Sequence, residues 1–267
     1  MAKNLPALLD KMWTDYVAIN PLAQKVYDLF TARGDKVLND HIALRTFNHP
    51  RLSVDVIAAP FIASGYVYGG DYHFTDKKLY AKHYEHPDKN LPKIFISELK
   101  LQDFSQELQK TVNSLVEQIP AGLEHTFDFS SIGRPWKVTK ATYEKLMKES
   151  DYAAWVAAFG YRPNHFTVFI NALKSFKDIQ TLNTFLKAEG VKLNSSGGEI
   201  KGTPEVFLEQ SSTLANNIEV KFDDGAMTIP ACYYEFARRY PLKSGELYQG
   251  FVAASADKIF ESTSKGQ

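Results

Sequence analysis

The chain has 267 residues, of which 44% are hydrophobic and 23% charged, as in a globular protein built from one large domain or two fused modules. Lys plus Arg and Asp plus Glu each total 31, so the formal net charge is zero, and the sequence lacks the basic stripe that a sequence-independent grip on nucleic acid requires. The single cysteine, Cys232, excludes a disulfide framework and a paired-cysteine zinc site.

The sequence also predicts no membrane partner. No segment approaches the ~18 apolar residues that a spanning helix needs. Asp10 and Lys11 interrupt the N-terminal region where a signal peptide would need an unbroken apolar run. We therefore expect a cytoplasmic protein whose partners are small molecules, with no nucleic acid and no membrane among them.

The first hundred residues predict two helices followed by a β-α-β-β-β module. Asn20-Pro21 separates the helices, Gly34 ends the second, and Ser53 is the expected cap of a later helix. The N-terminal helices occupy 1–36 and module one occupies 37–101. The predicted helices are 5–17, 21–33 and 53–64, and the predicted strands are 40–47, 66–68, 79–84 and 93–101.

A helical insertion at 102–163 is predicted to separate module one from a second module, at 164–242, with a similar order of elements. Asp224-Gly225 is a hairpin signal inside module two. A C-terminal helix is expected at 243–267. The predicted helices are 103–119, 139–159, 175–189 and 244–262, and the predicted strands are 165–171, 191–194, 205–213, 217–222 and 228–239. Residues 1–267 then form a single α+β domain of paired βαβββ modules with added helices.

Histidines begin the first strand of both modules. Because side chains alternate along a strand, His41 and Arg45 share one face while Ile42 and Leu44 share the other. The second face suits a hydrophobic core. The first face carries a potential metal ligand and a cation, which are rarely buried without a purpose. His165 is placed in the same way at the start of module two.

We interpret His41, His165 and Glu235 as a 2-His-1-carboxylate triad, which leaves open positions on a divalent metal such as the Fe(II) of non-haem oxygenases. The alternative for each residue is a hydrogen-bonded core histidine or a paired carboxylate. Glu98 stands at the position of module one that we equate with Glu235. Glu98 could be a fourth ligand. The favoured interpretation is that it supports a metal ligand or forms an ion pair.

Other residues are candidates for contacts with a substrate. Arg45 lies four residues beyond His41, roughly 13 Å along the strand, and could bind the distal carboxylate of a small diacid chelated to the metal. Gln210 could donate a hydrogen bond to substrate, and His73 could line the pocket entrance. We interpret His83 and His86 as ordinary polar surface and Cys232 as a buried structural thiol.

Four motifs together resemble the 2-oxoadipate dioxygenase/decarboxylase family over nearly the whole chain. They are D-H-I-A-L-R-T (40–46), N-H-F-T-V-F-I-N (164–171), Q-S-S-T (210–213) and Y-E-F-A-R-R-Y (234–240). The resemblance implies a fold related to the vicinal oxygen chelate proteins, with paired modules around a metal. It also implies conversion of 2-oxoadipate and O2 to 2-hydroxyglutarate and CO2 in lysine breakdown. Under it, His41, His165 and Glu235 take the places of the iron ligands and Arg45 that of the arginine that holds the substrate.

Two other functions stay open at this stage. A glyoxalase-like isomerase or hydrolase would use Glu98 as a fourth ligand to Zn(II) or Ni(II), a site suited to Lewis-acid chemistry. A non-catalytic module would bind a small molecule between the sheets. Metal content and dependence on oxygen discriminate between the three functions.

Overall fold

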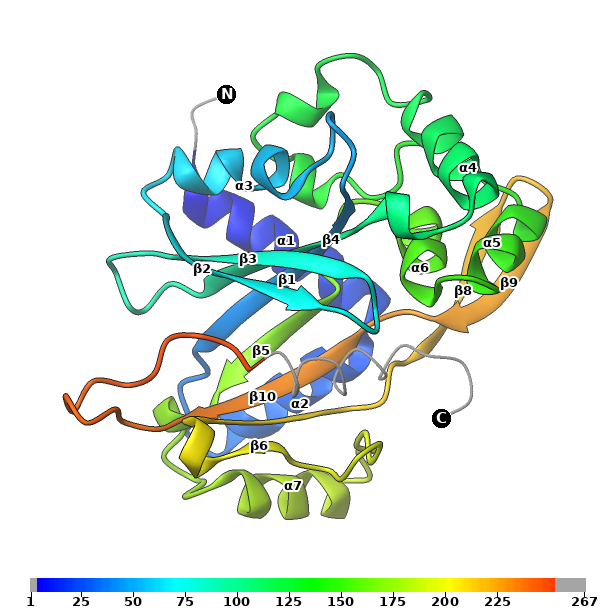
Figure 1. Ribbon diagram of the computed structural model, residues 1–267. Coiled ribbons are helices and arrows are strands. Elements are labelled where there is room, and N and C mark those ends of the chain that lie inside the picture. The colour runs from blue at the N-terminus through cyan, green and yellow to red at the C-terminus, as the bar shows by residue number, and fades with distance from the viewer. Residues whose placement is uncertain (1–3, 253–267) are drawn as a thin grey trace.

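The computed structural model describes residues 4–252, and its centre is one curled, mixed sheet of eight strands in the order β2-β3-β4-β1-β5-β10-β7-β6 (Figure 1). A separate hairpin, β8-β9, projects from one end of the sheet. The strands are β1 Asn39–Phe47, β2 Val67–Phe74, β3 Leu79–Glu85, β4 Lys93–Leu99, β5 His165–Phe169, β6 Lys201–Thr203, β7 Leu208–Ser212, β8 Asn217–Phe222, β9 Gly225–Pro230 and β10 Tyr233–Arg239. The predicted α+β class is confirmed.

The two predicted modules meet at the centre of this sheet, where β1 pairs with β5 in antiparallel fashion. On one side β1 pairs in parallel with β4, and on the other β5 pairs in parallel with β10. The first and last long strands of each module are therefore neighbours. This arrangement brings β1, β5 and β10 side by side, although they are far apart in the sequence.

Helices cover the outer face of the sheet. Trp13 and Tyr16 of α1 pack on Phe166 of β5, and Phe30 of α2 packs on Phe236 of β10. These contacts confirm that the aliphatic and aromatic face of each strand belongs to the core. The helices are α1 Leu5–Ile19, α2 Pro21–Ala32, α3 Val54–Ile62, α4 Gln106–Val116, α5 Lys140–Met147, α6 Asp151–Phe159 and α7 Ile179–Ala188. The inner face carries polar side chains, among them His41 and Glu235.

Several predicted helix boundaries are wrong because other residues cap the helices. Asp103 lies in a 3-10 turn, and α4 is capped instead by Ser105. The stretch 139–159 is two helices, because Ser150 caps α6 after α5 has ended. Asp178 caps α7, which therefore begins four residues later than expected. Each of these caps accepts a hydrogen bond from the backbone of the first turn.

Module two differs most from its prediction. The hairpin signal at Asp224-Gly225 is confirmed, but β8 and β9 leave the main sheet and pair only with each other. Residues 191–194 contribute a single bridge, through Leu193, rather than a strand. The short strand β6 was not expected. The predicted C-terminal helix is wrong for residues 244–252, which form no helix and contribute a single bridge through Leu247, and its remainder lies outside the described residues.

The entry to β5 depends on a glycine. Gly160 ends α6 with φ 68° and ψ −141°, a conformation that is essentially restricted to glycine. A Cβ there would lie 2.3 Å from the Gly133 carbonyl oxygen and 2.4 Å from Arg134 Cα. Gly133 and Tyr161 exchange two backbone hydrogen bonds at this point, so the close approach joins the helical insertion to the strand that carries His165.

We expect Gly160→Ala to lower the free energy of unfolding by ~2 kcal/mol or more, because it combines a disfavoured φ with a backbone clash. Gly122 is the matched control, since it also has a positive φ, 83°, but a Cβ there would meet nothing within 4 Å. Gly122→Ala should cost only about 1 kcal/mol. Urea denaturation of both variants measures the difference, and equal losses would contradict this account.

Candidate metal centre

Three adjacent strands bring His41, His165 and Glu235 together on the inner face of the sheet. Their potential ligand atoms all lie within 4.8 Å of one another, and all three side chains are buried. Glu235 Oε1 is 3.5 Å from His41 Nε2, and Glu235 Oε2 is 3.3 Å from His165 Nε2. Strand pairing produces this meeting, because Thr167 is the register partner of both His41 and Glu235.

The other nitrogen of each imidazole is held by the residue that precedes it in the chain. His41 Nδ1 lies 2.8 Å from Asp40 Oδ1, and His165 Nδ1 lies 3.1 Å from Asn164 Oδ1. Both rings are thereby oriented with Nε2 toward Glu235. Metal-binding histidines are typically fixed in this way, with the second ring N–H donated to a carboxylate or carbonyl oxygen.

Sequence reasoning missed Asp40 and Asn164, although both stand beside a predicted ligand. In a regular strand the residue before a histidine points to the opposite face. The register of β1 against β5 shifts between Asn39 and His41, so Asp40 departs from the alternation. Asn164 precedes the first residue of β5. The repeated pattern of a polar residue before histidine, D-H and N-H, was the signal that could have identified them.

Burial sets the protonation of this cluster. It lowers the pKa of His41 and lowers that of His165 well below the usual value, so both imidazoles are neutral and able to bind a cation. Burial also raises the pKa of Glu235 to about 8, against the hydrogen bonds from Gln210 and Thr167. Among residues 4–252, no Lys or Arg forms an ion pair with Glu235. A divalent cation would provide the positive charge that this carboxylate lacks.

Asp40 is charged, in contrast to Glu235. Burial alone would raise its pKa, but the Arg239 guanidinium holds it well below the usual range. Arg239 donates from Nε and Nη2 to the two oxygens of Asp40, at 2.6 and 2.8 Å. Asp40 is therefore a fixed acceptor for His41. The donor set of two neutral imidazoles and one carboxylate fits a divalent first-row metal with open positions.

Arg45 shares the inner face with His41, as predicted. It is buried, and its guanidinium lies 5.0 Å from the ring centres of Tyr152 and Trp155 on α6. Burial raises the pKa of Tyr233 well above its usual value, against the charge of the nearby Arg45, and the Tyr233 ring stacks on His165 at a centroid distance of 4.6 Å. Arg45 is thus a buried cation at the α6 end of the face that carries the cluster.

Gln210 reaches the cluster from β7. Its Nε2 donates to Glu235 Oε1 at 2.5 Å, so in this structure it supports the carboxylate rather than facing open space for a substrate. The role of His73 at the entrance stays a prediction: 69% of its side chain is exposed, and its neighbour Tyr72 takes the inner face of β2. The interpretation of His83 as surface is wrong, since it is 1% exposed.

Glu98 is not the counterpart of Glu235. Glu235 pairs with Thr167, which lies two residues after His165. The equivalent position in module one is Ala43, two residues after His41, and its partner on β4 is Phe95. Glu98 lies three residues further along β4 and therefore points to the opposite face. Its Oε2 accepts a hydrogen bond from the Val54 backbone N–H at the first turn of α3, at 2.8 Å. It lies outside the group of potential ligands.

Comparison with solved structures identifies the fold. A glyoxalase superfamily protein from Ralstonia eutropha superposes with a TM-score of 0.77 at 21% identity, covering 92% of this chain and 84% of that one. The likeness confirms the predicted vicinal oxygen chelate type of fold. A Shewanella frigidimarina structure described as a hydrolase gives a TM-score of 0.91 at 52% identity, over 95% of this chain and all of that one. The described residues contain no helix long and apolar enough to cross a membrane.

Comparison of sequences identifies the family. The chloroplastic 2-oxoadipate dioxygenase/decarboxylase of Arabidopsis thaliana is 36% identical over 98% of this chain and 78% of its own length. The hydroxyglutarate synthase of Oryza sativa, crystallised with 2-oxoadipate, is 33% identical with a TM-score of 0.92, covering 97% of this chain and 91% of that one. The family profile matches residues 9–126 and 125–249. The chain therefore belongs to the 2-oxoadipate dioxygenase/decarboxylase family.

Proposed function

We propose that this protein is an Fe(II)-dependent enzyme that converts 2-oxoadipate and O2 to 2-hydroxyglutarate and CO2. The observation that carries the proposal is the convergence of three buried ligand atoms, from His41, His165 and Glu235, on one face of the sheet. A Zn(II) or Ni(II) site with Glu98 as fourth ligand is disfavoured, because Glu98 lies on the other face. The atoms balance: six carbons become five plus one, and both oxygen atoms of O2 enter the products.

Fe(II) would supply open coordination positions and the redox chemistry that activates dioxygen. The residues of the chain hold and orient the reactants. His41, His165 and Glu235 would hold the metal, and its open positions would be available to the 2-oxo acid group of the substrate. Asp40 keeps the Nε2 atom of His41 directed toward Glu235, and Gln210 orients the Glu235 carboxylate. Fixed ligands of this kind keep the reactants in place without rearrangement during the reaction.

Arg45 is the proposed partner of the distal carboxylate. Its backbone is roughly 13 Å from that of His41 along β1, and its long side chain can cover part of that span. The rings of Tyr152 and Trp155 pack around the guanidinium and reduce its contact with water, which strengthens a bidentate ion pair with a carboxylate. A six-carbon diacid held at both ends would therefore lie along the inner face of β1.

The cellular role stays a proposal as well. We propose a cytoplasmic enzyme of lysine breakdown, supported by the lone buried thiol of Cys232. The two plant relatives are named as proteins of the chloroplast or amyloplast. A non-catalytic binding module is disfavoured by the family membership.

His165→Ala should abolish stoichiometric metal binding, since loss of a ligand should weaken affinity by more than the ~10- to 100-fold that loss of a supporting residue costs. Anaerobic titration with Fe(II), and with Co(II) as a spectroscopic probe, measures the affinity. Glu98→Gln is the matched control, and it should bind the metal as the unsubstituted protein does. Equal metal binding by all three proteins would refute the proposed ligand set.

Arg45→Gln should lower kcat/KM for 2-oxoadipate roughly 10- to 100-fold, the size of a lost charged hydrogen-bond pair. The same variant should lose much less with 2-oxohexanoate, which has no distal carboxylate. Oxygen uptake and CO2 release measure both reactions. Absence of oxygen uptake by the Fe(II)-loaded native chain with 2-oxoadipate would reject the proposed reaction, and an equal loss with both acids would reject the role of Arg45.

A further inference from the structure

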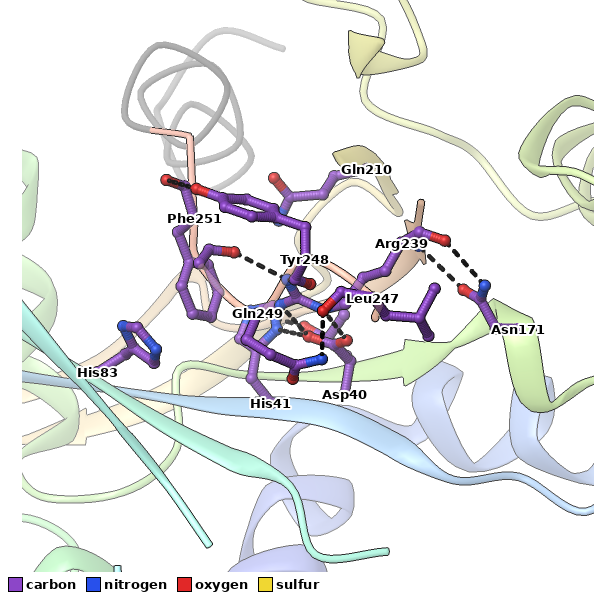
Figure 2. A network of polar contacts seen from close by, with 12 residues as sticks. Asp40, His41, His83, Asn171, Gln210, Arg239, Leu247, Tyr248, Gln249 and Phe251 are labelled. Atoms are coloured by element: carbon purple, nitrogen blue, oxygen red, sulfur yellow. Dashed lines mark hydrogen bonds and ion pairs between the residues drawn. The ribbon is translucent and has the colours of Figure 1, made fainter. Parts of the chain in front are cut away.

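One arginine links the candidate metal centre to a segment that crosses beside it. Arg239 is 2% exposed, and its Nη1 donates to the carbonyl oxygens of Tyr248 and Gly250, at 2.9 and 2.8 Å. Its Nε and Nη2 bind the two oxygens of Asp40, which in turn holds His41 (Figure 2). A single planar guanidinium therefore fixes a potential metal ligand and residues 248–251, which we name the strap.

A second anchor fixes the end of the strap. The Phe251 backbone N–H donates to the Tyr72 hydroxyl oxygen at 3.1 Å. That oxygen lies 2.9 Å from His83 Nδ1, and His83 Nε2 lies 3.3 Å from Glu85. The polar groups of His83 thus have partners, and the imidazole supports Tyr72. Three residues from two halves of the sheet, Arg239, Tyr72 and His83, hold the strap in one position.

With the strap held in this way, the Phe251 ring packs against the inner face of the sheet. Its centroid is 4.8 Å from that of His41, 4.8 Å from that of Phe95 and 5.2 Å from that of His83, and the residue is 6% exposed. Phe95 is the register partner of Ala43, which lies between His41 and Arg45 on the same face. Phe251 therefore borders the stretch that a diacid bound at both ends would occupy.

A cavity lies next to Asp40 and Arg239, and one residue of the strap, Gln249, lines it. This cavity has a volume of about 390 Å³, and its lining includes Asp40, Arg239, Leu247 and Gln249. His41, His165 and Glu235 do not line it. Asp40 therefore contacts both this cavity and His41.

We propose that Phe251 is a specificity-determining residue that limits the width of the 2-oxo acid accepted beside His41, and that Arg239 is the positioning residue that holds Phe251 and His41 in one arrangement. The inference rests on the proposed function, because it assigns the substrate to the inner face of β1. Lysine in place of Arg239 could not donate to Asp40 and to two carbonyls in this planar geometry.

Phe251→Ala tests the specificity role. Calorimetric titration of the Co(II)-loaded protein gives the ratio of the dissociation constants for phenylpyruvate and 2-oxoadipate, and oxygen uptake of the Fe(II) form gives the corresponding ratio of kcat/KM. Both ratios should change at least about tenfold in favour of phenylpyruvate, because its ring fills the space that the Phe251 side chain occupied. Phe251→Leu should shift them less, and Co(II) affinity should stay near that of the unsubstituted protein. Unchanged ratios would overturn the specificity role.

Arg239→Lys tests the positioning role. Co(II) affinity, followed by visible absorption, should fall roughly 10- to 100-fold because Asp40 no longer holds His41 rigidly, and the acid preference should shift as in Phe251→Ala. Arg238→Lys is the matched control, since the Arg238 guanidinium lies over Tyr240, and it should change neither value. Native Co(II) affinity in Arg239→Lys would overturn the positioning role.

Two further outcomes are distinguishable. If thermal melting shows that Arg239→Lys does not fold, Tyr72→Phe replaces it, because it removes the hydroxyl that accepts from the Phe251 N–H and contacts His83, and leaves Arg239 and Asp40 unchanged. This variant should shift the acid preference in the same direction by a smaller factor, and an unchanged preference would count against the strap. If the unsubstituted protein neither binds 2-oxoadipate nor consumes oxygen with it, the proposed function fails, while the Co(II) titrations still decide the role of Arg239.

Discussion

The burial of Glu235 without a cationic side chain is the constraint on which the site depends. A carboxylate removed from water costs several kcal/mol unless a charge or hydrogen bonds compensate it. Here Gln210 and Thr167 offer hydrogen bonds, but the nearest basic groups are two imidazoles that burial keeps neutral. Among residues 4–252, the buried cationic side chains contact other groups: Arg239 pairs with Asp40, Arg45 lies over the rings of α6, and Lys201 donates to the Asn194 carbonyl oxygen. The cluster is therefore arranged for a positive charge that comes from outside the chain.

The placement of the two buried arginines follows from that constraint. Arg239 neutralises Asp40, so Asp40 can be charged at a site where Glu235 alone would retain its proton. Arg45 lies among the aromatic rings of α6, away from Glu235. If either guanidinium paired with Glu235, the carboxylate would lose its affinity for a metal. Separation of the cations from Glu235 is thus as important to the site as the convergence of the ligands.

The sequence predicted the parts of the site that depend on strand alternation. His41 and Arg45 were assigned to one face because even spacing in a strand is a local property, and the structure has them on that face. Glu98 was misassigned because pairing register is a property of two strands, and a shift of three residues reverses the face. His83 was misassigned because its burial depends on Phe251, far away in sequence. The β8-β9 hairpin was recognised from its turn, but its departure from the sheet had no local signal.

The motif A-R-R shows how two identical neighbours acquire different roles. Along β10, alternation gives Arg239 the same face as Glu235 and Ala237, and gives Arg238 the opposite face. Arg239 is consequently buried with Asp40 and the strap, while Arg238 lies over Tyr240. Residues four apart on a strand are roughly 13 Å from each other, and Arg239 pairs with Asp40 rather than with Glu235. Through Asp40, Arg239 orients His41 on β1. Strand geometry therefore separates Glu235, whose carboxylate faces both histidines, from Asp40, whose carboxylate positions His41.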